Sequence, residues 1–213
     1  MKTDLAAVIE KIKETRRAVP NERSALVAIS GIDGCGKGYI TAQMVAMLQA
    51  AGLRTAGINI DGWLNLPRKR FSEANPAEHF YLNALRFEEM FAQLIVPLRD
   101  CRSVRVEMDY AEETATQYRK QVCEFQDVDV IVLEGIYLLK PEFRQHYDLS
   151  VWIECSFETA LQRAIARGQE GLAAEETTRA YHTIYFPAQK IHFERDQPKE
   201  AADLVLVNDP ALA

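Results

Sequence analysis

A glycine-rich stretch near the N-terminus has the residue types needed to bind phosphate. In "VAISGIDGCGKGYI", residues 27–40, an apolar run leads into glycines and a lysine, and apolar residues then follow at helical spacing. Glycines let backbone N–H groups turn inward around an anion, and the following helix adds its dipole. Lys37 can then reach the terminal phosphates of a nucleotide. The predicted nucleotide contacts are Gly31, Asp33, Gly34, Cys35, Gly36, Lys37, Gly38 and Tyr39.

This loop departs from the usual phosphate-binding pattern G-x-x-x-x-G-K-[S/T] at its last position. The pattern places a hydroxyl after the lysine to coordinate Mg²⁺, whereas this chain has Gly38 there. The next residue, Tyr39, is a poor ligand for Mg²⁺, and Thr41 lies further along the predicted helix. We therefore predict an intact phosphate cradle whose metal is held by carboxylates, waters and phosphates.

Two acidic residues end predicted buried strands. Asp61 follows "GINI" and Glu134 follows "VIVL". The carboxyl ends of the strands line the ligand crevice of an open parallel sheet, so both acids should converge with Lys37. Mg²⁺ needs only one or two carboxylates beside phosphates and water, so Asp61 and Glu134 are the predicted metal-site residues. The alternative for either acid alone is that the chain simply reaches solvent there.

Basic residues occur in two further places. Residues 68–70 are Arg-Lys-Arg, which is either a solvated charge run or a substrate-binding segment with Arg70 as the contact. Arg163 and Arg167 lie four residues apart and share one face of a predicted helix. That spacing is expected of a lid that neutralises a phosphoryl group during its transfer, and the alternative is that both are ordinary surface arginines.

The hydrophobic pattern predicts the elements that must position these residues. Strands are expected where apolar runs do not alternate, and helices where apolar residues recur at helical spacing. The predicted strands are residues 25–30, 54–61, 128–135, 147–155 and 202–208. The predicted helices are residues 4–18 (within an N-terminal segment 1–20), 37–51, 77–99, 156–167 and 174–195, the last kinked near Pro187.

Residues 103–110 and 115–125 alternate in hydrophobicity and should pair as a small antiparallel insertion. Elsewhere, predicted buried strands alternate with predicted helices along the chain. This order predicts an α/β fold with three layers, in which helices cover both faces of a doubly wound, mostly parallel sheet.

Length and composition narrow the class of protein. A chain of 213 residues is expected to form one domain, residues 1–213, with a lid region at about 163–186. The net charge of −6 argues against a nucleic-acid partner, and no apolar run approaches the roughly 18 residues of a membrane span. The four cysteines lack metal or disulfide spacing, which favours reduced thiols and a cytoplasmic location. The sequence does not indicate the oligomeric state, and a homo-oligomer is one possibility.

These segments, in this order, resemble the uridine kinase-like branch of P-loop kinases, which includes phosphoribulokinase and pantothenate kinase. The resemblance runs from about Ala25 to Asn208. The matching segments are "AISGIDGCGKG", "INIDGW", "VEMDYAEE", "VIVLEGIYLL", "ETALQRAIAR" and "YFPAQ" with "ADLVLVN". The resemblance implies a P-loop NTPase fold with a helical lid, ATP and Mg²⁺ as cofactors, and phosphoryl transfer to a hydroxyl of a small metabolite.

The resemblance also implies roles for individual residues. In that family the acid matching Asp61 takes the proton from the accepting hydroxyl, and the acid matching Glu134 supports Mg²⁺. The segment matching Asp109 and Tyr110 lies against the substrate. The implied catalytic residues are Asp61, Lys37, Arg163 and Arg167, and the implied substrate contacts are Asp109, Tyr110 and Arg70.

The chain departs from the family pattern in three places. Gly38 and Tyr39 replace hydroxyl residues, and "GQEGLAAEETT" holds none of the arginines that the lid normally carries between its helices. No clear counterpart of the base-recognising histidine follows "MDYAEE", which disfavours uridine itself as the acceptor. The expected acceptor is a small metabolite with a hydroxyl group, such as a nucleoside, a sugar or a pantothenate-like alcohol. The alternative is a catalytically weak or inactive nucleotide-binding regulatory protein. A GTPase is disfavoured because no N-K-x-D motif is present.

Overall fold

A five-stranded parallel sheet forms the centre of the computed structural model, which describes residues 4–111, 113–168, 171 and 173–212. The strand order is β2-β5-β1-β6-β7, and every neighbouring pair is parallel. The strands are β1 (Ala25–Gly31), β2 (Thr55–Asn59), β5 (Val130–Gly135), β6 (Leu149–Glu154) and β7 (Leu204–Val207). Because all five run the same way, their carboxyl ends lie along one edge of the sheet.

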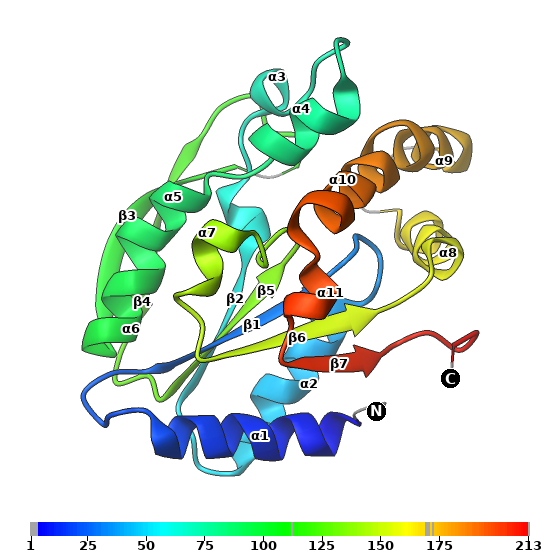
Figure 1. Cartoon of the computed structure of the whole chain (residues 1–213). Coiled ribbons are helices and arrows are strands. Elements are labelled where there is room, and N and C mark those ends of the chain that lie inside the picture. Colours follow the sequence, from blue (N-terminus) through cyan, green and yellow to red (C-terminus); the bar gives the residue numbers. More distant parts are fainter. Residues whose placement is uncertain (1–3, 112, 169–170, 172, 213) are drawn as a thin grey trace.

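Helices cover both faces of this sheet (Figure 1). One face packs against α1 (Leu5–Ala18) and α2 (Lys37–Ala50), and α7 (Pro141–Arg144) and α10 (Phe186–Asp196) lie over the other. Every residue of β1 and β5 is buried, which explains why their apolar runs do not alternate. The predicted three-layer, doubly wound α/β fold is confirmed.

The remaining helices surround the carboxyl edge and the ends of the sheet, and some of them continue directly into one another. They are α3 (Pro67–Arg70), α4 (Pro76–Asn83), α5 (Phe87–Met90), α6 (Val96–Cys101), α8 (Phe157–Arg167), α9 (Ala174–Ala180) and α11 (Pro198–Ala201). η1 (Ile60–Trp63) is a 3₁₀ turn, whereas η2 (Phe91–Ile95) and η3 (Tyr181–Tyr185) are π-helical segments that connect α5 to α6 and α9 to α10 without a break. α8 begins as predicted, because the Ser156 hydroxyl accepts a hydrogen bond from Thr159 N at 3.2 Å. The kink predicted near Pro187 is the π-helical turn η3.

The single long helix predicted over residues 77–99 is interrupted: α4 ends at Asn83, and α5, η2 and α6 form one continuous helical stretch over residues 87–101. The chain leaves helical geometry at residues 84–86, between α4 and α5. There the backbone forms hydrogen bonds with the segment that follows Asp61 in the chain. Asn65 N donates to Ala84 O, and Arg86 N donates to Trp63 O, each at 2.9 Å. These tertiary hydrogen bonds replace helical ones that the apolar spacing favoured. The predicted loop at 62–76 likewise contains part of η1 and all of α3.

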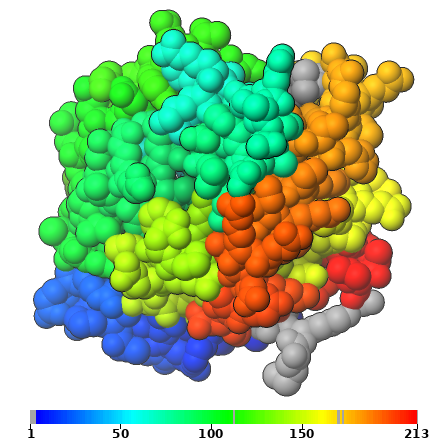
Figure 2. All heavy atoms as spheres, turned by 45° about the horizontal axis from the view of Figure 1, so that its top comes forward, coloured from blue at the N-terminus to red at the C-terminus, as the bar shows by residue number. Residues whose placement is uncertain are grey.

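The antiparallel insertion is confirmed as a hairpin of β3 (Val104–Tyr110) and β4 (Arg119–Phe125). On the upper side of the molecule, α4 lies directly against α10 (Figure 2), and the Phe80 and Tyr185 rings meet edge to face at 5.0 Å between centroids. Residues 169, 170 and 172 of the predicted lid, and residue 112 of "VEMDYAEE", lie outside the described residues. Within the described ranges, no helix has both the length and the apolar character needed to cross a bilayer.

Gly135 lets the end of β5 approach Ile60, the residue before Asp61. A Cβ at position 135 would lie 2.8 Å from Ile60 Cβ and overlap the rest of that side chain. We therefore expect Gly135→Ala to lower the free energy of unfolding by about 1–3 kcal/mol, measured by denaturant titration. The matched control is Gly38→Ala, whose Cβ would meet only Glu134 Oε1, at 3.5 Å. Because alanine favours helix, the control should be neutral or slightly stabilised, and equal destabilisation of both variants would contradict the packing argument.

Candidate active site

The loop between β1 and α2 has the backbone geometry of an anion cradle. Gly34 and Gly36 have φ of +77° and +89°, which L side chains rarely adopt. A Cβ at Gly34 would lie 2.5 Å from Ala160 O of α8, and one at Gly36 would lie 2.5 Å from Asn208 Nδ2. Glycine is therefore required at both positions, and this confirms that the predicted loop forms a tight turn at the N-terminus of α2.

Lys37 lies inside this loop. Its side chain is buried, and Nζ donates to Ile32 O at 2.9 Å and contacts Cys35 Sγ at 3.9 Å. Burial acts to lower the pKa of Lys37, but Cys35 and the surrounding carboxylates outweigh it and raise the pKa. Lys37 therefore keeps a positive charge where the phosphates of a nucleotide would lie.

The far side of the loop is held by residues from α8 and from the end of β7. Asn208 Nδ2 donates to Cys35 O at 2.7 Å, and Arg163 Nη1 donates to the same oxygen at 3.1 Å and to Asn208 O at 2.9 Å. Arg163 therefore fixes the loop as well as facing its ligand side. Sequence reasoning missed Asn208. Its position at the end of a predicted strand, the same signal that singled out Asp61 and Glu134, could have found it.

A cavity of ≈330 Å³ opens in front of the loop. It brings together Lys37 of α2, Asp61 of the turn η1 that follows β2, and Glu134 near the end of β5. Of the predicted loop contacts, Asp33, Gly34, Gly36, Lys37, Gly38 and Tyr39 line it. Gly31 and Cys35 are buried and do not. The convergence expected from the parallel strand ends is therefore present.

Asp61 is held by a residue that sequence reasoning did not identify. Asn59 Oδ1 accepts a hydrogen bond from Asp61 N at 2.6 Å and caps the turn η1. Asp61 reaches solvent inside the cavity, but the protein around it removes much of the bulk water. This desolvation, followed by the field of Asp33, raises the pKa of Asp61, while Lys37 and the Asn59 amide oppose the rise. An asparagine two residues before an acid, at a helical turn, was the signal available in the sequence.

Glu134 lies beside the place where the usual loop hydroxyl would be. A Cβ at Gly38 would be 3.5 Å from Glu134 Oε1, so a hydroxyl there would be the neighbour of this carboxylate. Glu134 is only 6% exposed, and this burial raises its pKa to about 7. A buried carboxylate facing a phosphate loop fits a divalent cation that also takes phosphate and water oxygens.

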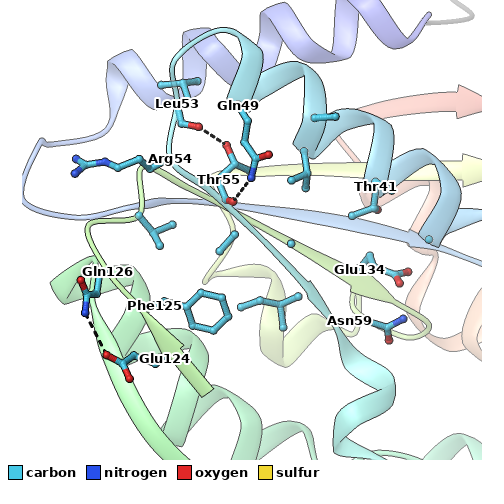
Figure 3. Close-up of a pocket in the computed structure, with 18 of the residues that line it drawn as sticks. Thr41, Gln49, Leu53, Arg54, Thr55, Asn59, Glu124, Phe125, Gln126 and Glu134 are labelled. Carbon is cyan, nitrogen blue, oxygen red and sulfur yellow. Dashed lines mark hydrogen bonds between the residues drawn. The ribbon is translucent and has the colours of Figure 1, made fainter. Parts of the chain in front are cut away.

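A larger cavity, of ≈960 Å³, runs between α2 and β2 (Figure 3). Gly38, Asn59 and Glu134 line both cavities, so the two meet beside the Glu134 carboxylate. Among the described residues that line the larger one, Arg54 is the basic residue, and it pairs with Asp127 at 3.3 Å. Phosphate binding needs loop amides and several cations, so we assign the candidate active site to the smaller cavity.

The predicted substrate contacts are placed differently from one another. Arg70 is buried and lines the active-site cavity, where its guanidinium donates to Glu113 O. Asp109 instead pairs with Lys120 at 2.8 Å. Tyr110 lines a separate cavity of ≈440 Å³ that reaches Asp61 from the hairpin side. Arg70 is therefore the substrate candidate that the structure brings to the phosphate loop.

The second lid arginine differs from the first in its surroundings. Arg167 is exposed and lines the active-site cavity. Its charge lowers the pKa of both Asp61 and Glu134, against the larger effect of burial. Arg167 is therefore the arginine of α8 that faces the carboxylates, whereas Arg163 is bonded to the loop backbone.

The raised pKa of Glu134 predicts a pH-dependent cost in stability. Between the ordinary pKa of 4.5 and about 7, the folded state holds a proton that the unfolded state releases, so stability falls as pH rises. Glu134→Gln cannot ionise and escapes this cost. In metal-free buffer, its advantage in unfolding free energy over the native chain should grow by on the order of 3 kcal/mol from pH 4.5 to pH 8. A constant difference across this range, measured by denaturant titration, would refute the buried state of Glu134.

Comparisons with known proteins identify the family and the fold. Residues 26–188 match the phosphoribulokinase / uridine kinase family. A possible uridine kinase from Bacillus stearothermophilus has a similar structure, with a TM-score of 0.71 and 20% identity over 96% of this chain and 100% of the other. A putative fructose transport system kinase from Silicibacter sp. TM1040 gives a TM-score of 0.72 and 22% identity, over 95% and 98%.

D-glycerate 3-kinase from Cryptococcus neoformans is a more distant similar structure, with a TM-score of 0.62 and 15% identity over 92% of this chain and 89% of the other. At these identities the structural likenesses establish the fold, whereas the family match covers most of the chain. The chain therefore belongs to the phosphoribulokinase / uridine kinase family and is a P-loop kinase of the small-molecule type.

Proposed function

We propose that this protein transfers the terminal phosphoryl group of ATP to a hydroxyl group of a small metabolite. The observation that carries the proposal is the single cavity lined by Lys37, Asp61 and Glu134. In the transfer, the acceptor oxygen forms a bond to the terminal phosphorus while the bond to the bridging oxygen breaks. The bonding electron pair leaves with ADP, and the hydroxyl proton passes to Asp61.

The residues of the chain divide this work by position. The loop amides and Lys37 bind and orient the phosphates, and Arg167 neutralises charge that develops during transfer. Asp61, held by Asn59, orients the acceptor hydroxyl and receives its proton. A raised pKa suits this role, because it brings the proton affinity of the carboxylate closer to the working pH.

Glu134 and Asp61 are the residues that we propose for Mg²⁺. When bound, the ion would neutralise phosphate charge and help to orient the transferred group. The carboxylate of Glu134 stands next to the vacant side-chain position at Gly38, which supports its use in place of the usual hydroxyl. Removing the ion should therefore weaken nucleotide binding.

The acceptor is a nucleoside, a sugar or a pantothenate-like alcohol in this proposal. Two of the similar structures named above are described as a possible uridine kinase and as a D-glycerate 3-kinase, and uridine and D-glycerate are both small molecules with hydroxyl groups. The active-site cavity supports a small molecule, because its ≈330 Å³ is near the lower end of the roughly 300–1,000 Å³ of ligand pockets.

Asp61→Asn tests the proposed role of Asp61 most directly. The variant keeps the backbone N–H that Asn59 caps but cannot take up the proton, so kcat should fall roughly 10²–10⁴-fold. ATP affinity in EDTA, measured by calorimetry, should stay close to that of the native protein, because the phosphate loop is unaltered. Turnover is followed by coupled ADP release over a panel of nucleosides, sugars and vitamin precursors.

The control is Asp127→Asn, the same chemical change at an exposed residue outside the cavity. It should leave kcat unaltered. Equal kcat in Asp61→Asn and the native protein would remove Asp61 from the mechanism. If the native protein turned over no acceptor and bound ATP equally with and without Mg²⁺, the regulatory alternative, which Gly38 favours, would replace the kinase.

A further inference from the structure

Arg70 brings a positive charge into the part of the cavity where the acceptor would bind. Three consecutive basic residues end the short helix α3. Arg68 and Lys69 are exposed, whereas Arg70 is 3% exposed and lines the cavity that contains Asp61. The helix therefore turns one of its three cations toward the candidate site and leaves the others in solvent.

The guanidinium of Arg70 is fixed in place. One of its nitrogens donates to Glu113 O, in the segment after β3, and its Cζ lies 5.1 Å from the centroid of the Phe71 ring. A guanidinium held in one orientation loses little entropy on binding and offers a planar set of donors. That geometry matches carboxylate and phosphate groups better than single hydroxyls.

The position of Arg70 separates it from the cations that serve the nucleotide. Lys37 belongs to α2, and Arg163 and Arg167 belong to α8. Arg70 comes from the segment that follows Asp61. The cavity is also lined by Leu64 and Phe80, which are buried and apolar, and the Phe80 ring stacks on Phe71 beneath Arg70. Besides the nucleotide-binding cations, the cavity therefore contains one fixed cation, an apolar surface and the proposed base.

We propose that the acceptor is a small hydroxy compound that carries a carboxylate or phosphate group, and that Arg70 binds this group. The inference rests on the proposed kinase function and narrows its substrate class. Glu113, which lines the same cavity, repels such a group and so limits its affinity. The apolar wall contacts the carbon skeleton, and the anion on Arg70 directs the free hydroxyl toward Asp61.

Matched pairs of acceptors test this substrate class. The coupled ADP-release assay compares D-glycerate with glycerol, ribose 5-phosphate with ribose, and pantothenate with pantothenol. Each pair differs in its anionic group, and the set separates carboxylate from phosphate. We expect turnover of an anionic member and at least roughly 10-fold lower kcat/KM for its neutral partner, because charged hydrogen bonds are the strong ones.

Three variants assign the effect to Arg70. Arg70→Gln should raise KM for the anionic acceptor roughly 10–100-fold and leave KM for ATP unchanged. Arg68→Gln is the control, since it removes the same charge from an exposed position of the same helix. Glu113→Gln should lower KM for the anionic acceptor, whereas a neutral polyol that used this carboxylate as a hydrogen-bond acceptor would bind more weakly.

Calorimetry of acceptor binding keeps the outcomes distinct. Anion binding that Arg70→Gln abolishes, without turnover by the native protein, would support the inference and refute the kinase proposal. Turnover of neutral members as efficient as that of their anionic partners would overturn the inference and leave the kinase proposal standing. An Arg70→Gln effect no larger than that of Arg68→Gln would also overturn it, as would the absence of both binding and turnover for every anionic probe.

Discussion

The parallel register of three neighbouring strands is the constraint on which the site depends. Ser30 is paired with Gly135 across β1 and β5, and Asn59 with Glu134 across β2 and β5. The loop after β1, the turn after β2 and the last residues of β5 must therefore meet at one edge of the sheet. A slip of one residue would turn Glu134 to the opposite face and separate it from Lys37. The strand register, more than the conformation of any loop, thus determines which side chains meet in the cavity.

Electrostatic crowding is the consequence of that convergence. Asp33, Asp61 and Glu134 share one small cavity, and the latter two carboxylates have raised pKa values, mainly because burial removes water from them. Lys37 and Arg167 offset part of this repulsion. Repulsion among these carboxylates makes the empty site unfavourable, so binding a divalent cation together with phosphates stabilises it. Stability lost here is consistent with a functional role, because such perturbed groups concentrate at functional sites.

Gly38 alters the part of the site beside Glu134 more than it alters the phosphate-binding loop. The loop keeps its amides, its positive-φ glycines and its lysine, but the side chain that would stand next to Glu134 is missing. The active-site cavity and the larger cavity beside α2 meet at Glu134, next to this glycine. The metal must then rely on carboxylates and phosphates. This is a local departure within a conventional fold.

The fold could be predicted well from the sequence because the patterns that indicate it involve residues close together in the chain. Buried strands, caps such as Ser156 and the alternation of the hairpin are all properties of neighbouring residues. The end-of-strand rule then brought Asp61 and Glu134 together correctly. The break in the helix predicted over residues 77–99 was missed because it depends on hydrogen bonds to a distant segment.

The parts of the site that sequence reasoning missed also depend on tertiary contacts. Asn59 and Asn208 act through side-chain hydrogen bonds to backbone atoms of the turn and the loop, and only the folded chain brings Asn208 to Cys35. The sequence pattern could not show that Arg70, rather than Asp109 or Tyr110, lines the cavity in front of the phosphate loop. The ion pair of Asp109 with Lys120 is set by the register of the hairpin.

The most direct test is a calorimetric titration of ATP into the native protein and into Glu134→Gln, with Mg²⁺ and with EDTA. If loop and carboxylates form one nucleotide–metal site, Mg²⁺ should strengthen ATP binding to the native protein. Glu134→Gln should lose that gain while keeping its affinity in EDTA, because the phosphate loop is untouched. Identical Mg²⁺ dependence in the two proteins would contradict the account, since Glu134 would then have no part in holding the metal.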